Sequence, residues 1–309
     1  MIKIVEVGPR DGLQNETGQV PTDVKIALVD ALSDSGVSEI EVSAFVSPKS
    51  IPQLKDAASV FEHILRTQGV VYSALVPNMT GFERALEAGA DKVAVFTAAS
   101  ETFNRKNINT SVDGSLKRFL PVVRRAVEMG LPVRGYISTA FWCAFEGKIS
   151  AGAVVRLAQR LMDMGVDEIA VSDTIGKATP EEVGQLMDVL IPVVPAAHLA
   201  VHFHDTYGNG IPNVLESVSH GIRVVDASVG GLGGCPFAPG ATGNVSTEAV
   251  VNALASAGHT VNVDVEKLIR ARRLLTPYLD VEPAPVPKSD SFGCSTCEFS
   301  DAPKCSKPT

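Results

Sequence analysis

The amino-acid sequence predicts an α/β fold, a (β/α)8 TIM barrel of parallel strands with one extra C-terminal helix. Three observations favour it. Short runs rich in β-branched residues alternate eight times with longer segments of helical periodicity. These runs are too apolar for strands that expose one face to water. Such apolar runs are typical of parallel strands that helices cover on the outside. The length of 309 residues suits one such barrel.

Each apolar run is interpreted as a strand, and the segment after it as a helix. The predicted strands are residues 2–7, 39–43, 70–75, 92–96, 132–137, 168–171, 199–203 and 224–228. The predicted helices are residues 22–35, 52–66, 80–89, 112–129, 150–165, 179–193, 208–220 and 245–257, with a further helix at 264–280. Thr179-Pro180-Glu181-Glu182 has the capping hydroxyl, proline and acids of a helix start. Glycines that typically end helices are Gly36, Gly89, Gly130, Gly165 and Gly221.

An open, doubly wound sheet is the alternative fold. Such a sheet usually has a Gly-x-Gly-x-x-Gly turn after its first strand, whereas this chain has Gly8-Pro9-Arg10-Asp11-Gly12. We therefore expect a barrel catalytic domain over residues 1–281 and a C-terminal tail over residues 282–309. The tail contains Cys294, Cys297 and Cys305 but no fourth ligand nearby. A flexible tail able to form redox-sensitive or intersubunit disulfides is favoured over a zinc site.

Composition excludes several classes of function. The 27 Lys and Arg against 35 Asp and Glu give a net charge of −8, and no basic cluster suggests a nucleic-acid partner. No apolar run approaches the ~20 residues that a membrane-spanning helix needs. The N-terminus begins with a strand pattern rather than a signal peptide, and the five cysteines form no disulfide framework. We expect a cytoplasmic protein, with a processed mitochondrial form as the alternative.

Polar residues gather where the predicted strands end. In a barrel of this kind the active site lies at the carboxyl ends of the strands. The polar residues there are Arg10, Asp11, Gln14, Asn15, Glu41, Ser43, Asn78, Ser100, Glu101, Ser138, Ser172, Asp173, Thr174, His202, His204, Asp205 and Asn244. Ionisable groups are concentrated in no other region of the sequence. We therefore predict a catalytic site at this end of the barrel.

His202 and His204 are the most specific indication of a site among these residues. Residues i and i+2 of a strand point to the same face, so both imidazoles are expected to share one divalent ion. Asp11 and the amide oxygen of Asn244 are expected at the same mouth. This mixture of nitrogen and oxygen ligands suits Mg²⁺ or Mn²⁺. Two structural histidines, hydrogen-bonded at a strand end, are the alternative.

Cys235 lies in a segment with five glycines between Gly230 and Gly240. Such a segment has few side chains to pack and much conformational freedom. A mobile loop that brings a thiol to the reaction as an acid or base is one interpretation, and an inert loop thiol is the other.

Two segments resemble the signatures of the 3-hydroxy-3-methylglutaryl-CoA lyase family. They are Glu6-Val-Gly-Pro-Arg-Asp-Gly-Leu-Gln-Asn-Glu16 and Ser228-Val-Gly-Gly-Leu-Gly-Gly-Cys-Pro-Phe-Ala238. Arg134-Gly-Tyr136, Asp173-Thr-Ile-Gly176 and His202-Phe-His-Asp-Thr-Tyr-Gly208 fall in the family's order and spacing. The resemblance extends from about residue 2 to residue 280.

The resemblance implies retro-Claisen cleavage of 3-hydroxy-3-methylglutaryl-CoA to acetyl-CoA and acetoacetate. It implies a Mg²⁺ or Mn²⁺ ion on Asp11, His202, His204 and Asn244, and an acyl-CoA substrate bound by Arg10, Gln14, Asn78, Ser138 and Asn109. Arg10 would stabilise the enolate and Cys235 would transfer protons, with Glu41 and Asp173 as supporting catalytic carboxylates. We also expect a homodimer or a higher homo-oligomer, and no membrane or nucleic-acid partner.

Some positions depart from the family pattern. After the fifth strand the chain has Thr139-Ala-Phe-Trp-Cys-Ala-Phe145, and Thr17, Ala44 and Ser172 replace the usual residues. Phe141 and Trp142 could reshape the acyl pocket, so a related 3-hydroxy-3-alkylglutaryl-CoA or citramalyl-type thioester is an alternative substrate. A condensing synthase on the same barrel and a non-catalytic scaffold are further alternatives.

Overall fold

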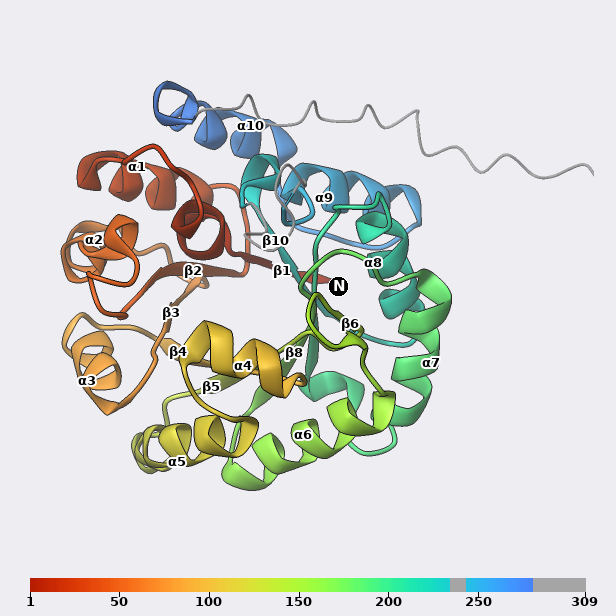
Figure 1. Ribbon diagram of the computed structural model, residues 1–309. Helices are drawn as coiled ribbons and strands as arrows, with labels where there is room; N and C mark the ends of the chain where they lie inside the picture. Colours follow the sequence, from red (N-terminus) through yellow and green to blue (C-terminus); the bar gives the residue numbers. More distant parts are fainter. Residues whose placement is uncertain (234–242, 280–309) are drawn as a thin grey trace, which may run out of the picture.

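Eight parallel strands close into a barrel in the computed structural model, which describes residues 1–233 and 243–279 (Figure 1). The order around the barrel is β1-β10-β9-β8-β5-β4-β3-β2. The strands are β1 (Lys3–Glu6), β2 (Glu39–Ala44), β3 (Val71–Leu75), β4 (Lys92–Ala98), β5 (Val133–Ser138), β8 (Glu168–Asp173), β9 (Leu199–Phe203) and β10 (Val224–Ala227). Every predicted strand is confirmed, with ends that differ by at most two residues.

The helices form a ring outside the strands (Figure 1). They are α1 (Thr22–Ser33), α2 (Ala57–His63), α3 (Met79–Glu87), α5 (Val112–Met129), α6 (Ala151–Met164), α7 (Pro180–Leu190), α8 (Gly210–Ser219) and α9 (Thr247–Ser256). The extra helix α10 (Val265–Arg273) packs outside α1 and α9. The side chain and backbone of Thr179 form a capping box with Glu182 at the start of α7, as predicted. All five predicted helix-ending glycines have a positive φ.

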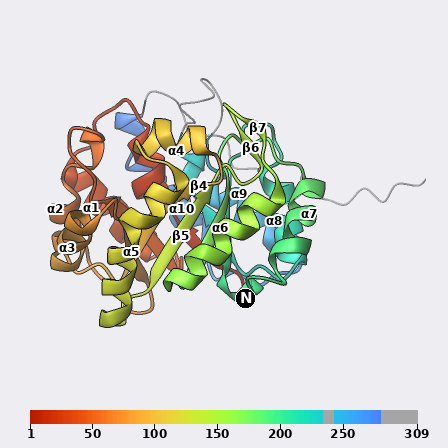
Figure 2. The same ribbon diagram turned by 60° about the horizontal axis from the view of Figure 1, so that its bottom comes forward.

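Two elements at the mouth of the barrel were not predicted. Helix α4 (Glu101–Ile108) and the hairpin of β6 (Trp142–Cys143) and β7 (Gly147–Lys148) lie at the end of the barrel opposite the N-terminus (Figure 2). Helix α4 buries only Phe103 and Asn104, so its sequence has no apolar stripe that indicates a helix. Its start depends instead on Ser100, whose hydroxyl accepts a hydrogen bond from the Phe103 N–H at 3.0 Å.

The two faces of each strand differ in chemistry. Outward-facing residues such as Ile40, Val95, Ile169 and Val201 belong to the main hydrophobic core between strands and helices. Inside the barrel, Ala94, Ala170 and Ala200 cluster around Tyr136. Because these alanines are small, the barrel interior has room for long charged side chains from neighbouring positions.

The expected boundary between a domain of residues 1–281 and a tail of residues 282–309 falls outside the described residues. Cys294, Cys297 and Cys305 lie outside them too. Within residues 1–233 and 243–279, no helix has the length and apolarity needed to cross a lipid bilayer.

Candidate active site

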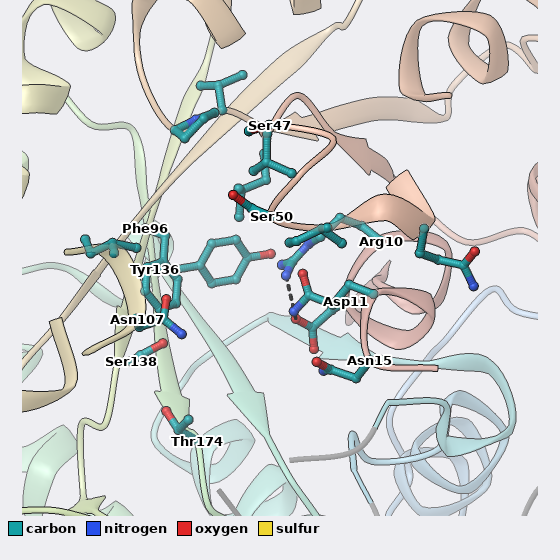
Figure 3. A pocket seen from close by; sticks show the side chains of 18 of the residues that line it. Arg10, Asp11, Asn15, Ser47, Ser50, Phe96, Asn107, Tyr136, Ser138 and Thr174 are labelled. Atoms are coloured by element: carbon teal, nitrogen blue, oxygen red, sulfur yellow. Dashed lines mark hydrogen bonds and ion pairs between the residues drawn. The ribbon is translucent and has the colours of Figure 1, made fainter. Parts of the chain in front are cut away.

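A cavity of about 760 Å³ opens at the carboxyl ends of the strands (Figure 3). Most of the predicted site residues line it together: Arg10, Asp11, Gln14, Asn78, Asn109, Ser138, His202 and His204. Ser47 and Ser50 from the loop after β2, Phe96 of β4 and Tyr136 of β5 are among the other residues of its walls. The predicted site residues therefore come together at one end of the barrel.

Asp11, His202 and His204 converge at the bottom of this cavity. The Nε2 atoms of His202 and His204 lie 3.4 Å apart, and His202 Nε2 lies 3.8 Å from Asp11 Oδ2. One potential ligand atom from each of the three residues lies within 4.8 Å of those of the other two. His204 follows the last residue of β9 and pairs with Asn244 through an isolated backbone bridge, which fixes the second imidazole beside the first.

The protonation states of these groups fit a divalent cation. Burial and the neighbouring His202 lower the pKa of His204 to about 4, so this imidazole is neutral at pH 7. Burial alone would raise the pKa of Asp11, but Arg10 and the two imidazoles hold it at about 2, so the carboxylate is ionised. Neutral imidazole and ionised carboxylate are the forms that bind metals.

Asn244 lies beside this cluster, but its amide is turned differently from the prediction. Its Nδ2 donates hydrogen bonds to Asp11 Oδ2 and to the Leu232 carbonyl, each at 3.0 Å. The amide nitrogen, rather than the predicted Oδ1 ligand atom, therefore faces Asp11. Which atom of an amide faces its neighbour is not encoded in the sequence pattern.

Arg10 is held rigidly in the cavity wall. Its guanidinium pairs with Asp11 Oδ1 at 2.5 Å and with Glu41 Oε2 at 2.5–2.6 Å, and it lies 5.4 Å from the ring centre of Tyr136. Figure 3 shows the Tyr136 hydroxyl pointing toward Arg10. This arrangement keeps one positive charge at a fixed place beside the cluster of Asp11, His202 and His204.

Glu41 is near the site but does not line the cavity. It is 1% exposed and lies behind Arg10, where it also accepts a hydrogen bond from the Tyr136 hydroxyl at 3.3 Å. Burial raises its pKa despite the adjacent Arg10. The structure therefore places Glu41 against Arg10 and Tyr136 rather than on the cavity wall.

Asp173 is not brought to the cavity, contrary to the prediction of a catalytic carboxylate there. Ser172 and Thr174 line the cavity, and Asp173 between them points to the opposite side because side chains alternate along a strand. Its Oδ2 accepts a hydrogen bond from the Ala178 N–H at 2.8 Å, and burial raises its pKa to about 6. It therefore supports the loop after β8.

Arg134, Tyr136 and Asp226 were not among the site residues predicted from the sequence. Asp226 Oδ2 lies 3.2 Å from Nδ1 of His202, and Asp226 Oδ1 accepts a 2.6 Å bond from Arg134. Arg134, Tyr136 and Ser138 alternate along β5, so their spacing already indicated one shared face. Asp226 is the single acidic residue of the apolar strand β10, and this pattern could have indicated a site residue.

The unusual residues after β5 do not shape the cavity. The Phe141 ring packs on Phe203 with 6.2 Å between centroids, and Trp142 Nε1 donates to Glu182 at 3.1 Å. Neither residue lines the cavity formed by the described residues, so the structure gives no support to the hypothesis that they reshape an acyl pocket. Among the described departures from the family pattern, Ser172 alone lines it. Cys235 lies outside the described residues.

Comparisons with known proteins agree with this geometry. The family described as HMGL-like matches residues 1–275. The chain is 50% identical over 270 residues to the cytoplasmic 3-hydroxy-3-methylglutaryl-CoA lyase of Danio rerio, covering 87% of this chain and 81% of the relative. It is 48% identical over 279 residues to the mitochondrial hydroxymethylglutaryl-CoA lyase of Bos taurus, covering 90% and 86%.

Solved structures of the same kind superpose on the chain. An HMG-CoA lyase from Brucella melitensis has a TM-score of 0.88 and 46% identity, and the match covers 91% of this chain and 99% of that one. An HMG-CoA lyase from Acinetobacter baumannii, solved with coenzyme A and 3-methylmalate, has a TM-score of 0.88 and 38% identity, with 98% of both chains covered.

The cluster at the cavity bottom predicts a loss of metal affinity when a histidine is removed. His202→Ala should weaken Mn²⁺ binding at least ~10-fold, because one of three converging ligands disappears. Free Mn²⁺ can be measured by electron paramagnetic resonance during titration of the metal-free protein. His198→Ala is the matched control, since His198 precedes the other end of β9 and contacts the Asp167 carbonyl. Equal affinities for the two variants would rule out His202 as a ligand.

Proposed function

This chain belongs to the HMGL-like family, and on that premise we propose that it cleaves 3-hydroxy-3-methylglutaryl-CoA to acetyl-CoA and acetoacetate. The reaction is a retro-Claisen cleavage by a metal-dependent carbon–carbon lyase. One observation carries the proposal: Asp11, His202 and His204 converge beside the fixed charge of Arg10 in a single cavity.

We propose that Asp11, His202 and His204 hold Mg²⁺ or Mn²⁺, with Asn244 as a further ligand. When bound, such an ion supplies Lewis acidity that lowers the pKa of a substrate hydroxyl. An amide rotation that exchanges Nδ2 and Oδ1 would give Asn244 an oxygen ligand in place of its present donation to Asp11. Mixed imidazole and oxygen ligands suit either of these ions.

The bond changes require one proton to leave and one to return. Loss of the proton from the C3 hydroxyl allows the C2–C3 bond to break, and C3 becomes the ketone carbon of acetoacetate. The electron pair of that bond moves onto the thioester as the enolate of acetyl-CoA. Protonation of C2 then completes acetyl-CoA, so no net proton is consumed.

Arg10 stabilises the enolate. Its guanidinium is oriented before substrate arrives, because Glu41 and Asp11 bind it and Tyr136 packs beside it. A charge that is already in place where negative charge develops lowers the barrier without reorganisation. Glu41 serves the reaction by positioning Arg10.

Cys235 is proposed as the acid and base that moves the proton. Of the other two candidates from the sequence, Glu41 lies behind Arg10 and Asp173 faces the loop after β8. Cys235 itself lies outside the described residues, so its role rests on the resemblance and on the family membership.

Binding of the acyl-CoA is assigned to the polar residues of the cavity wall. Gln14 donates to Asp11 Oδ1 at 3.2 Å and so lies next to the metal-binding cluster. Asn78 uses Oδ1 to cap α3, and its amide N–H groups are proposed to bind substrate. Ser138 and Asn109 line the same cavity from β5 and from the end of α4. The residues that suggested a different acyl group, Phe141 and Trp142, lie outside the cavity wall, so the parent substrate is favoured.

The proposed activity is tested by incubating the pure protein with 3-hydroxy-3-methylglutaryl-CoA and Mg²⁺ or Mn²⁺. Acetyl-CoA and acetoacetate should form in equal amounts. Chelation by EDTA should abolish turnover, and either ion should restore it, since three side chains are proposed to hold the metal. A citramalyl-CoA substrate run in parallel separates the alternative thioester. Full activity in a preparation shown to be metal-free would contradict the mechanism.

Arg10→Met should separate catalysis from binding. We expect kcat to fall by ~10²-fold or more with little change in KM, because the charge is needed mainly when the enolate forms. Steady-state kinetics give both constants, and the Mn²⁺ affinity of the variant shows whether Asp11 is still in place. Arg66→Met, on the outer surface, is the control for loss of an arginine. A raised KM with unchanged kcat would make Arg10 a substrate-binding residue only.

Cys235→Ser should slow proton transfer by ~10²-fold or more, since a serine hydroxyl titrates far above the thiol. Single-turnover cleavage reports the chemical step, and equilibrium binding of a CoA-ester analogue reports affinity, which should not change. Cys143→Ser is the matched control, because Cys143 is buried and donates to the Ser100 hydroxyl, a bond that serine can keep. If Cys235→Ser cleaves substrate at the wild-type rate, the thiol has no part in proton transfer.

A further inference from the structure

We propose that Asp226 is a positioning residue that orients His202 for metal binding, and that Arg134 holds Asp226 in place. This inference rests on the metal site of the proposed function. Both side chains lie inside the barrel but do not line the cavity. Their role in the reaction is therefore indirect and acts through His202.

Asp226 is placed by the barrel to meet one nitrogen of His202. The two residues are partners in the β10–β9 register, and both side chains point into the barrel. Asp226 Oδ2 lies 3.2 Å from His202 Nδ1, on the side of the ring away from His204. The Asp226 side chain has no solvent exposure. Water therefore does not compete for this contact.

The contact determines which nitrogen of His202 can bind a metal. An ionised carboxylate only accepts hydrogen bonds, so the ring proton must be on Nδ1 when His202 is neutral. Nε2 then carries the lone pair, and Nε2 is the atom that lies 3.8 Å from Asp11 Oδ2 and 3.4 Å from His204 Nε2. Carboxylates that fix ligand histidines in this manner typically change metal affinity 10- to 100-fold when they are removed.

Arg134 keeps Asp226 both charged and fixed. It reaches across the barrel from β5, and its NH2 donates to Asp226 Oδ1 at 2.6 Å. The same guanidinium pairs through Nε with Glu168 at 3.1 Å and donates through NH1 to the Tyr136 hydroxyl at 3.3 Å. Arg134 is thus held on three sides, and the buried carboxylate has the paired cation that it needs.

The second histidine lacks an equivalent partner. Nδ1 of His204 is buried and makes no hydrogen bond to any described residue. His202 is therefore the imidazole whose proton the protein places, and His204 is oriented by its backbone bridge to Asn244. The difference between the two histidines makes the role of Asp226 specific and testable.

Asp226→Asn tests the proposal without removing volume. Asparagine has one side-chain acceptor oxygen where aspartate has two, so it cannot serve both His202 and Arg134. We expect the Mn²⁺ dissociation constant of the metal-free protein, measured by electron paramagnetic resonance, to rise 10- to 100-fold. Glu168→Gln is the matched control, because it perturbs the same buried network at the other side of Arg134 but does not touch His202. Its Mn²⁺ affinity should change less than ~3-fold on the same scale.

Thermal unfolding of both variants without metal separates positioning from general damage. A loss of Mn²⁺ affinity confined to Asp226→Asn supports the proposal, whereas equal Mn²⁺ affinity for wild type and Asp226→Asn overturns it. Equal losses in both variants also overturn it, since they would reflect the network as a whole. If the wild type itself binds no Mn²⁺, the metal site of the proposed function fails instead.

A measurement on the wild-type protein tests the proposal even if no Asp226 variant folds. In metal-free protein with ¹⁵N-labelled histidine, the neutral ring of His202 should show a protonated Nδ1 and an unprotonated Nε2. The His202→Ala variant identifies its signals among those of the six histidines. A protonated Nε2 on His202 would overturn the proposal even if metal affinity depends on Asp226.

Discussion

A continuous series of charged side chains inside the barrel, joined by ion pairs and through the His202 ring, is the constraint on which the rest of the structure depends. Each neighbouring pair in the series lies within 3.8 Å, and the series is Glu39, Lys92, Glu168, Arg134, Asp226, His202, Asp11, Arg10 and Glu41. A charge buried without a partner costs several kcal/mol, so each strand must keep its register for its neighbours to remain paired. Five carboxylates face three cationic side chains in this series. The excess negative charge favours a cation at its cavity end, beside Asp11 and the two histidines.

The main elements of this arrangement could be predicted from sequence because their signals are local. Runs of β-branched residues identify strands wherever both faces are covered. His202 on β9 and His204 just after its end are two residues apart and so share a face, and Asp11 must lie at the same end of the barrel once β1 is placed. These inferences need only the periodicity of a strand and the direction of the chain.

Other parts could not be predicted because they depend on contacts between distant residues. The side chain of Asp173 turned away because β8 continues to that residue, and the end of a strand is poorly encoded. Arg134 meets Asp226 from 92 positions away in the chain, across a space that Ala94, Ala170 and Ala200 leave open. Neither the alanines nor the charges suggest this contact on their own. The orientation of the Asn244 amide follows from its hydrogen bonds, which exist only in the folded protein.

The hairpin of β6 and β7 gives the molecule a built-in optical reporter. Trp142 is the chain's single tryptophan, and it lies on this hairpin at the cavity end of the barrel. Its indole N–H donates to Glu182, and the Lys177 ammonium lies 3.8 Å from its ring centre. Both charged groups are close enough to perturb the excited indole. Tryptophan emission from the protein therefore comes from one known place, and its wavelength and intensity report on the electrostatic surroundings of this hairpin without any added dye.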